Sequence, residues 1–309
     1  MLLLSLLPFS ASASASSIPK MSGFGSPTTT LLSPSVDGLS LPLRTLRGGA
    51  INRSLPSFST MSPIQISLTT GLALILLQTL LQNLLLRSSF PVLNKKPGYL
   101  AHTLIVVPLM TFVSLFGLFG YLFDFPQNVA SPVLSNLPNA KILASILSGI
   151  MIWDVPTSYA VPGLRSSDIL IHHSLLFFIS ILAAMKLSSY WCYFYFGVVE
   201  LVSPPLSVYD QLERCTEIAE ECKDKNLEKL KKWRDSWKVI AAVTFTITRA
   251  GMFTFVTWFK FLPQCMKALS IANPVQKAVI QFMSVMVVGF SALQLWWFSL
   301  LVKEAAKGF

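Results

Sequence analysis

Seven long apolar blocks constrain this chain more than any other feature of its sequence. Each block is about 18–25 residues long, which is the length that a helix needs to cross about 30 Å of hydrocarbon. Charged residues make up only 12% of the chain, about half their share in a typical soluble domain. We therefore predict an all-α membrane protein with about seven transmembrane helices. The blocks cover residues 64–86, 101–123, 141–160, 169–185, 189–206, 239–259 and 278–302.

The formal net charge of +10 does not indicate a nucleic-acid partner in such a chain. Loops on the side of the membrane that is not translocated accumulate Lys and Arg. With seven spans, the loops on the side of the C-terminus carry most of these residues. We therefore expect the C-terminus on the cytosolic side, or on the stromal side in a plastid. The cysteines lack CxxC spacing and indicate neither a metal site nor a disulfide framework; they are Cys192, Cys215, Cys222 and Cys265.

Residues 1–60 differ in composition from the rest of the chain. A short apolar run and an Ala-x-Ala-like region come first, and a Ser-, Thr- and Pro-rich stretch with the single acid Asp37 follows. A basic, hydroxyl-rich and acid-poor composition is typical of a transit peptide. We expect a signal-like or transit-like leader that directs the protein to an endoplasmic reticulum or plastid membrane. A disordered tail is the alternative. Residues 61–89 would then hold the first transmembrane helix.

Residues 207–238 form the one substantial polar loop between apolar blocks. The stretch from Tyr209 onward contains neither Pro nor Gly. Opposite charges stand at i,i+4 spacing in the pairs Glu221–Lys225 and Glu228–Lys232, which favours a helix. We expect a solvated or interfacial helix here, most simply a charged linker.

Two of the three histidines stand together in IHHSLLFF at 171–178. Ionisable groups within membrane spans are costly, so each is a candidate for function. His173 and Glu200 are nearly equidistant from the expected turn near Leu187, which places both about 20 Å from it in neighbouring helices. A carboxylate facing an imidazole is suited to proton transfer, or to fixing which ring nitrogen carries the proton. We predict that Glu200 orients His172 or His173, only one of which faces inward.

Further polar residues fall in the same half of the expected bundle. Arg249 lies at mid-depth, where a guanidinium is tolerated only with a partner, and Glu200 and Asp154 are the available carboxylates. Simpler explanations exist for single residues. Glu200 and Arg249 are explained equally by a structural ion pair, and Asp154 by a cap on the irregular segment at Pro156. The gathering of several polar residues in one half of the bundle is harder to explain in this way. These residues are Asp154, His172, His173, Glu200, Arg249 and Gln294, with His102 expected at the membrane interface.

Several motifs together resemble the TLC-domain family, over about residues 90–309. The most specific resemblance is the order of the His pair, a Glu-x-x-Ser-Pro motif with Glu200 and Ser203, and the intramembrane Arg249. The family includes ceramide synthases, translocon-associated proteins and lipid-regulating proteins. The resemblance implies six helices around a lipid-accessible cavity, with the first helix outside this bundle. The motifs are Asp154, HHSLLFF, FGVVELVSPPLSVYDQLE, ITRAGMF and LQLWWFSLLVKEAAKGF.

The chain departs from the ceramide synthases, which carry a further His–Asp pair and more acids downstream. It is more similar to the small TLC-domain proteins of the TLCD/TMEM type. This resemblance implies a protein that binds or regulates membrane lipids. Its lipid-binding residues would be Asp154, Ser203, Arg249 and Gln294.

The alternative function is a lipid acyltransferase with acyl-CoA as its co-substrate. Its catalytic residues would be His172, His173 and Glu200, with an imidazole as general base or nucleophile. Neither function requires a metal or a resident cofactor. Membrane lipids are the expected partners, and the sequence leaves homo-oligomerisation open.

Overall fold

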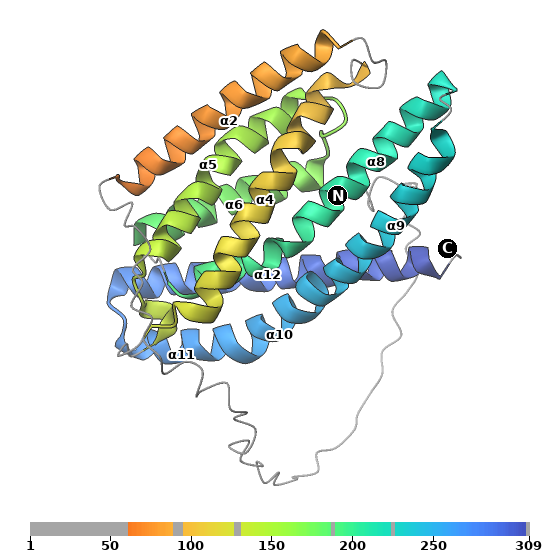
Figure 1. Cartoon of the computed structure of the whole chain (residues 1–309). Helices are drawn as coiled ribbons and strands as arrows, with labels where there is room; N and C mark the ends of the chain where they lie inside the picture. Colours follow the sequence, from red (N-terminus) through yellow and green to blue (C-terminus); the bar gives the residue numbers. More distant parts are fainter. Residues whose placement is uncertain (1–60, 89–94, 127–130, 187–188, 224–225, 307–309) are drawn as a thin grey trace, which may run out of the picture. The chain divides into compact units, whose positions relative to one another are not determined.

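The computed structural model describes residues 61–88, 95–126, 131–186, 189–223 and 226–306, and this part of the chain is helical with no strand (Figure 1). The leader predicted for residues 1–60 lies outside the described residues. Six described helices are long and apolar enough to cross a membrane, which confirms an all-α membrane protein. They are α2 (Pro63–Leu86), α4 (Pro97–Phe123), α5 (Pro138–Ala160), α6 (Ser167–Lys186), a continuous helix over Leu227–Ile271, and α12 (Pro274–Ala305).

The apolar block at 189–206 does not form one spanning helix, so the prediction of a separate span there is wrong. It is divided between α7 (Trp191–Phe196), the 3₁₀-helix η2 (Val198–Val202) and the start of α8 (Ser203–Cys222). Pro204 and Pro205 have no N–H to donate to the carbonyls four residues earlier. Instead, the amide of Ser203 donates to the carbonyl of Glu200, which closes the tighter 3₁₀ turn.

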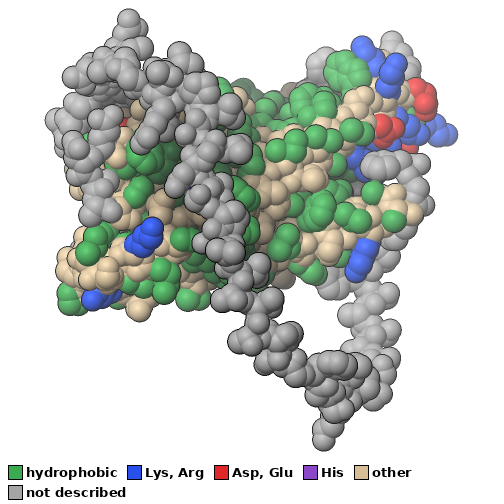
Figure 2. All heavy atoms as spheres, turned by 90° about the horizontal axis from the view of Figure 1, so that it is seen from below, with side chains coloured by type: hydrophobic (Ala, Val, Ile, Leu, Met, Phe, Trp, Pro, Cys, Tyr) green, Lys and Arg blue, Asp and Glu red, His purple; other side chains and the backbone are tan. Residues whose placement is uncertain are grey.

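The polar segment 207–238 is also not one linker helix. It forms the outer part of a hairpin between α8 and α9 (Leu227–Phe245). The left-handed backbone of Lys223, with φ of 53°, ends α8. Across the hairpin, Lys231 lies 3.0 Å from Glu220. Most of the charged side chains on the face drawn in Figure 2 gather at one end, while hydrophobic side chains are spread over the rest.

The ion pairs that the structure describes in this segment have other partners than the expected i,i+4 pairs. Glu221 contacts Lys95 at 2.9 Å, and Glu228 contacts Lys231 at 3.7 Å. Lys225 lies outside the described residues. Ion pairs therefore connect α8 to α9 within the hairpin, and they connect the hairpin to the chain just before α4.

The helix over Leu227–Ile271 has 45 residues, or about 68 Å at 1.5 Å per residue. It is more than twice as long as the hydrocarbon layer is thick, so its polar first turns extend beyond that layer. After α9 it continues through two π-helical stretches, and π turns are frequent at functional sites. Its later parts are η3 (Thr246–Phe253), α10 (Thr254–Val256), η4 (Thr257–Phe261) and α11 (Leu262–Ile271).

Glycines bring the helices that carry polar residues close together. A Cβ atom on Gly117 of α4 would lie 2.2 Å from the Cα atom of Gly197, directly before η2. A Cβ atom on Gly120 would lie 2.3 Å from the ring of Tyr193 on α7. Only the missing side chains allow α4 to pack this tightly on α7 and η2. The position of Glu200 within the bundle depends on this contact.

The first helix, α2, packs mainly on α5 through a second close contact. A Cβ atom on Gly149 would lie 2.6 Å from the carbonyl oxygen of Ser67. The hydroxyl of Ser67 donates to the carbonyl of Ser145 at 2.9 Å. Several leucines on α2, including Leu72, Leu76 and Leu80, remain exposed, as expected for a helix at the edge of a bundle in lipid. The short 3₁₀-helix η1 (Pro132–Leu134) lies between α4 and α5.

Candidate functional site

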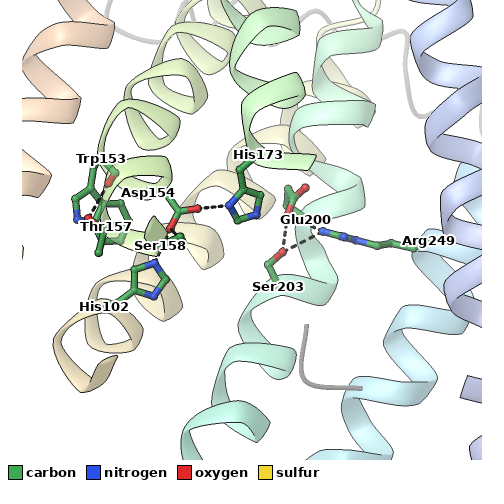
Figure 3. A network of polar contacts seen from close by, with 9 residues as sticks. All are labelled: His102, Trp153, Asp154, Thr157, Ser158, His173, Glu200, Ser203 and Arg249. Carbon is green, nitrogen blue, oxygen red and sulfur yellow. Dashed lines mark hydrogen bonds and ion pairs between the residues drawn. The ribbon is translucent and has the colours of Figure 1, made fainter. Parts of the chain in front are cut away.

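Asp154 on α5 binds two histidines from the two neighbouring helices. Its Oδ1 atom lies 2.5 Å from Nε2 of His102 on α4, and its Oδ2 atom lies 2.5 Å from Nδ1 of His173 on α6. The carboxylate is 4% exposed. We call these three residues the His–Asp–His cluster (Figure 3). A buried carboxylate that faces two imidazoles fixes the orientation of both rings.

Neighbouring side chains complete the surroundings of this cluster. The indole of Trp153 stacks on the ring of His102, with 4.9 Å between the centroids. The hydroxyl of Ser158 donates to Oδ1 of Asp154 at 3.5 Å. Asp154 lies within α5, and Pro156 is accommodated inside the same helix. The carboxylate is therefore engaged by side chains from other helices, and a cap at Pro156 does not account for it.

A second polar group lies on η2, α8 and η3. Arg249 donates to Oε2 of Glu200 at 3.0 Å and to the hydroxyl of Ser203 at 3.3 Å. The hydroxyl of Ser203 also donates to Oε2 of Glu200. We call these residues the Glu–Ser–Arg cluster. In this cluster, the guanidinium of Arg249 on a π-helical turn lies beside the carboxylate of Glu200 on a 3₁₀ turn. Glu200 is therefore the partner that a guanidinium within the membrane requires.

The predicted pairing of Glu200 with a histidine is wrong. His173 contacts Asp154, and Glu200 contacts Arg249 and Ser203. Figure 3 shows the His173 ring between Asp154 and Glu200, with its marked contact to Asp154. Distance from a turn gives only the heights of His173 and Glu200 along straight helices. The 3₁₀ turn that carries Glu200 changes the direction in which its side chain points.

Both clusters line one cavity of about 140 Å³. By that measure of volume a single water needs about 10–15 Å³, so the cavity holds much more than one water. Its wall is otherwise apolar, with Val106, Leu109, Met110, Ile150, Leu176 and Leu206 among the lining residues. We call this space the first chamber.

A smaller cavity of about 60 Å³, the second chamber, adjoins the first. His172, Leu176, Glu200 and Arg249 line both chambers. Gln294, which is 2% exposed, lines the second chamber. Apolar residues dominate the remaining wall, including Ile179, Phe196, Val199, Phe253, Met283 and Val287.

His172 has surroundings unlike those of His173. Its ring meets Phe290 and Trp297 of α12 edge-on, with centroid distances of 5.1 and 5.6 Å. Among the described residues, its Nδ1 atom has no hydrogen-bond partner. Both members of the histidine pair therefore line the cavity system, contrary to the expectation that only one faces inward.

Two residues of the site were not among the predicted site residues. The sequence predicts His102 at the membrane interface, yet it is 8% exposed and contacts Asp154. Asp210 on α8 lines the first chamber, and the hydroxyl of Tyr99 on α4 donates to its Oδ2 atom. Burial raises the pKa of Asp210 to about 7. Asp210 lies within the charged loop, so its sequence neighbours do not distinguish it from a solvated acid.

The predicted site residues thus lie in one cavity system. Asp154, His173, Glu200, Ser203 and Arg249 line the first chamber, Gln294 lines the second, and His172 lines both. In the described part of the chain, no group of three or more His, Cys, Asp and Glu side chains is arranged to hold a metal ion.

Comparison with known protein families gives one match. A family model described as the TLC domain matches residues 109–303. Searches of curated proteins and of solved structures found no match. The matched range contains every predicted site residue and leaves out His102, which lies just before it.

Proposed function

The chain belongs to the TLC-domain family, and we propose that it binds the polar headgroup of a membrane lipid in the first chamber. In this role it would act in lipid homeostasis, as a lipid-binding protein or a regulator of membrane composition. The observation that carries the proposal is the convergence of two buried polar clusters on one otherwise apolar cavity within a helical membrane protein.

The chemistry of the cavity supports a ligand that is part polar and part apolar. Lipid-binding pockets need apolar walls with a few convergent polar groups. Here the polar groups come from α4, α5, α6, η2, α8 and η3, while leucines, valines and methionines fill the remaining wall. Maintaining the six ionisable or hydroxyl side chains of the two clusters in a membrane bundle is costly, which favours a role in binding over a purely structural one.

Filling the cavity tests this function. Leu176 lines both chambers, so Leu176→Trp should exclude a lipid. Leu175 is 36% exposed on the same helix, so Leu175→Trp adds the same indole outside the cavity. We expect a lipid class to copurify with the wild type and with Leu175→Trp, and to be depleted in Leu176→Trp when extracted lipids are quantified by mass spectrometry. Equal lipid content in all three proteins would refute the proposal.

A second candidate function, lipid acyl transfer from acyl-CoA, is favoured by the contact between Asp154 and His173. A carboxylate that orients an imidazole is the arrangement used for general base catalysis. His173 would take the proton of a lipid hydroxyl as its oxygen attacks the thioester carbonyl. The carbon–sulfur bond would break, and the departing thiolate would receive that proton to leave as the thiol.

Replacing His173 by Gln separates the two functions. Gln can still donate and accept hydrogen bonds, but it cannot act as a base near neutral pH. We expect His173→Gln to abolish acyl transfer if the protein is an acyltransferase, while lipid copurification persists. The measurement is incorporation of a labelled acyl chain from acyl-CoA into extracted lipids, with purified wild type and variant compared. Absence of incorporation with the wild type would exclude this candidate.

A further inference from the structure

We propose that the lipid bound by this cavity has an uncharged headgroup, whose hydroxyl or amide group hydrogen-bonds Gln294 and Trp297 where the two chambers meet. This inference rests on the proposed function, because it names the class of lipid that the cavity would take. It adds a binding site on α12 and α6 beside the Glu–Ser–Arg cluster, because Glu200 and Arg249 line both chambers.

The charges that line the chambers argue against an anionic headgroup. The guanidinium of Arg249 is already within 3.0 Å of Glu200, although its Nε atom has no hydrogen-bond partner among the described residues. No lysine of the described part of the chain lines either chamber. The imidazoles of His102 and His173 both face the carboxylate of Asp154. A phosphate would therefore have to share the guanidinium of Arg249 with Glu200, and it would enter at a high desolvation cost.

A cationic headgroup is disfavoured by the use of the carboxylates. Asp210, whose Oδ1 atom has no partner among the described residues, lines the first chamber but not the second. Of the other two carboxylates, both oxygens of Asp154 contact imidazoles, and Oε2 of Glu200 accepts from Arg249 and Ser203. A quaternary ammonium group would have to compete with these contacts. An uncharged group would not disturb them.

Unpartnered polar atoms mark the place where an uncharged group can bond. Among the described residues, Gln294 Oε1, Trp297 Nε1 and His172 Nδ1 are buried with no hydrogen-bond partner. Such atoms are rare in folded proteins and call for an explanation. Gln294 is 2% exposed and lines the second chamber, and Trp297 lines the first chamber and contacts the ring of His172.

The side chains of Gln294 and Trp297 match the chemistry of a hydroxyl or amide group. The indole of Trp297 is a donor only, whereas the Gln294 amide both donates and accepts. A hydroxyl or amide group likewise offers one donor and at least one acceptor. The adjoining apolar wall, with Val287 and Phe290 of α12, would cover the carbons next to that group.

Three lipids with the same acyl chains test the headgroup class. They are dioleoylglycerol with a free hydroxyl, dioleoyl phosphatidate with an anionic phosphate, and a dioleoyl lipid with a trimethylammonium group. The purified full chain is equilibrated with each lipid in mixed micelles and separated by gel filtration, and bound lipid is quantified by mass spectrometry. We expect dioleoylglycerol to bind at least tenfold more tightly than either charged lipid. Equal or tighter binding of a charged lipid would overturn the assignment to uncharged lipids.

Variants on α12 test the site itself. Gln294→Leu should weaken dioleoylglycerol binding about tenfold, the effect of one buried hydrogen bond, and Trp297→Phe should weaken it similarly. Gln281 is exposed on the same helix, so Gln281→Leu is the matched control and should bind as the wild type does. Since Gln294→Leu removes an unpartnered polar group, its melting temperature should not fall. Unchanged binding in both site variants would refute the site.

The outcomes distinguish this inference from the proposed function. If lipid copurifies with the protein but dioleoylglycerol does not bind, the inference fails and the lipid-binding function stands. If no lipid copurifies and none of the three lipids binds, both fail.

Discussion

The Oδ2 atom of Asp154 lies 2.5 Å from Nδ1 of His173, and this contact joins α5 to α6 at the wall of the cavity. The other carboxylate oxygen joins α5 to α4 through His102 at the same distance. One side chain thus connects three helices. In hydrocarbon, where water cannot replace a lost partner, such a connection should matter for stability as well as for binding.

Replacing Asp154 by Asn should therefore destabilise the protein strongly. The amide offers one acceptor oxygen where the carboxylate offers two, and it carries no charge for the imidazoles. Breaking a buried pair by removing one partner costs about 3–5 kcal/mol. Thermal unfolding in detergent measures the loss, with Asp235→Asn on exposed α9 as a control expected to change stability by less than about 1 kcal/mol. Equal melting temperatures for both variants would contradict this prediction.

Glu200 and Arg249 should show strong energetic coupling. Each single change, Glu200→Gln or Arg249→Met, leaves a polar or charged partner unpaired in the bundle and should lower the unfolding free energy. The double variant leaves no unpaired charge, so its loss should be smaller than the sum of the single losses by about 1–3 kcal/mol. Thermal or chemical denaturation of the four proteins gives this difference. Additive losses would show that the pair does not interact in the folded protein.

Asp210 should make stability depend on pH. Its folded-state pKa is raised to about 7 by burial, from the ordinary 3.8. The neutral form is therefore favoured in the folded state, so stability is highest below about pH 4 and falls as the pH rises towards 7. We expect the wild-type melting temperature to decrease from pH 5 to pH 8. Asp210→Asn should reduce this decrease and be more stable than the wild type at pH 8.

Glu213 on the same helix also has a pKa raised by burial, so a smaller slope should remain in the Asp210→Asn variant. The exposed substitution Asp235→Asn should leave the wild-type pH profile unchanged. Parallel profiles for wild type and Asp210→Asn would rule out Asp210 as the titrating group.

Gly117→Ala should separate α4 from η2. The added methyl group would meet backbone at 2.2 Å from the Cα atom of Gly197, and backbone cannot rotate away as a side chain can. We expect a large drop in melting temperature and in copurified lipid, because Glu200 moves with η2. Gly289 is the matched control, since a Cβ atom there meets nothing within 4 Å. Gly289→Ala should be neutral or slightly stabilising, and similar losses in both variants would contradict the packing argument.

Cys222 reports on which side of the membrane the hairpin lies. It is exposed, whereas Cys192 and Cys265 are buried. The eight Lys and Arg residues of segment 207–238 predict that the hairpin faces the cytosol or stroma. A membrane-impermeant maleimide should therefore label the wild type in sealed vesicles with that face outward, and label Cys222→Ser much less. Labelling of Cys222 only after detergent treatment would reverse the predicted orientation.

Much of the fold follows from residue type and block length. The apolar runs that became α2, α4, α5, α6 and α12 have the length and uniformity that lipid demands, and no neighbouring segment competes for them. The free-energy cost of an ionisable side chain within the membrane likewise predicts that Asp154, Glu200 and Arg249 need partners. The structure brings each of them into contact with another polar side chain.

The pairing within the site did not follow from the sequence. Distance from a turn gives the height of His173 and Glu200 but not the direction of their side chains, and two prolines turn the backbone at Glu200 into a 3₁₀ helix. His102 was misplaced because its nearness to a block end suggested an interface. In the structure, α4 begins at Pro97, so His102 already lies within the helix, facing Asp154.

The two clusters divide the chain in sequence as well as in space. His102, Asp154 and His173 all precede residue 187, whereas Glu200, Ser203 and Arg249 all follow residue 188. During synthesis, when N-terminal segments are made first, the first cluster can close as soon as α6 is complete. The second must wait until the ribosome has passed Arg249. During that interval the first half of the protein can already bring its three polar residues together, whereas the cavity, which residues of both halves line, forms only when the second half joins it.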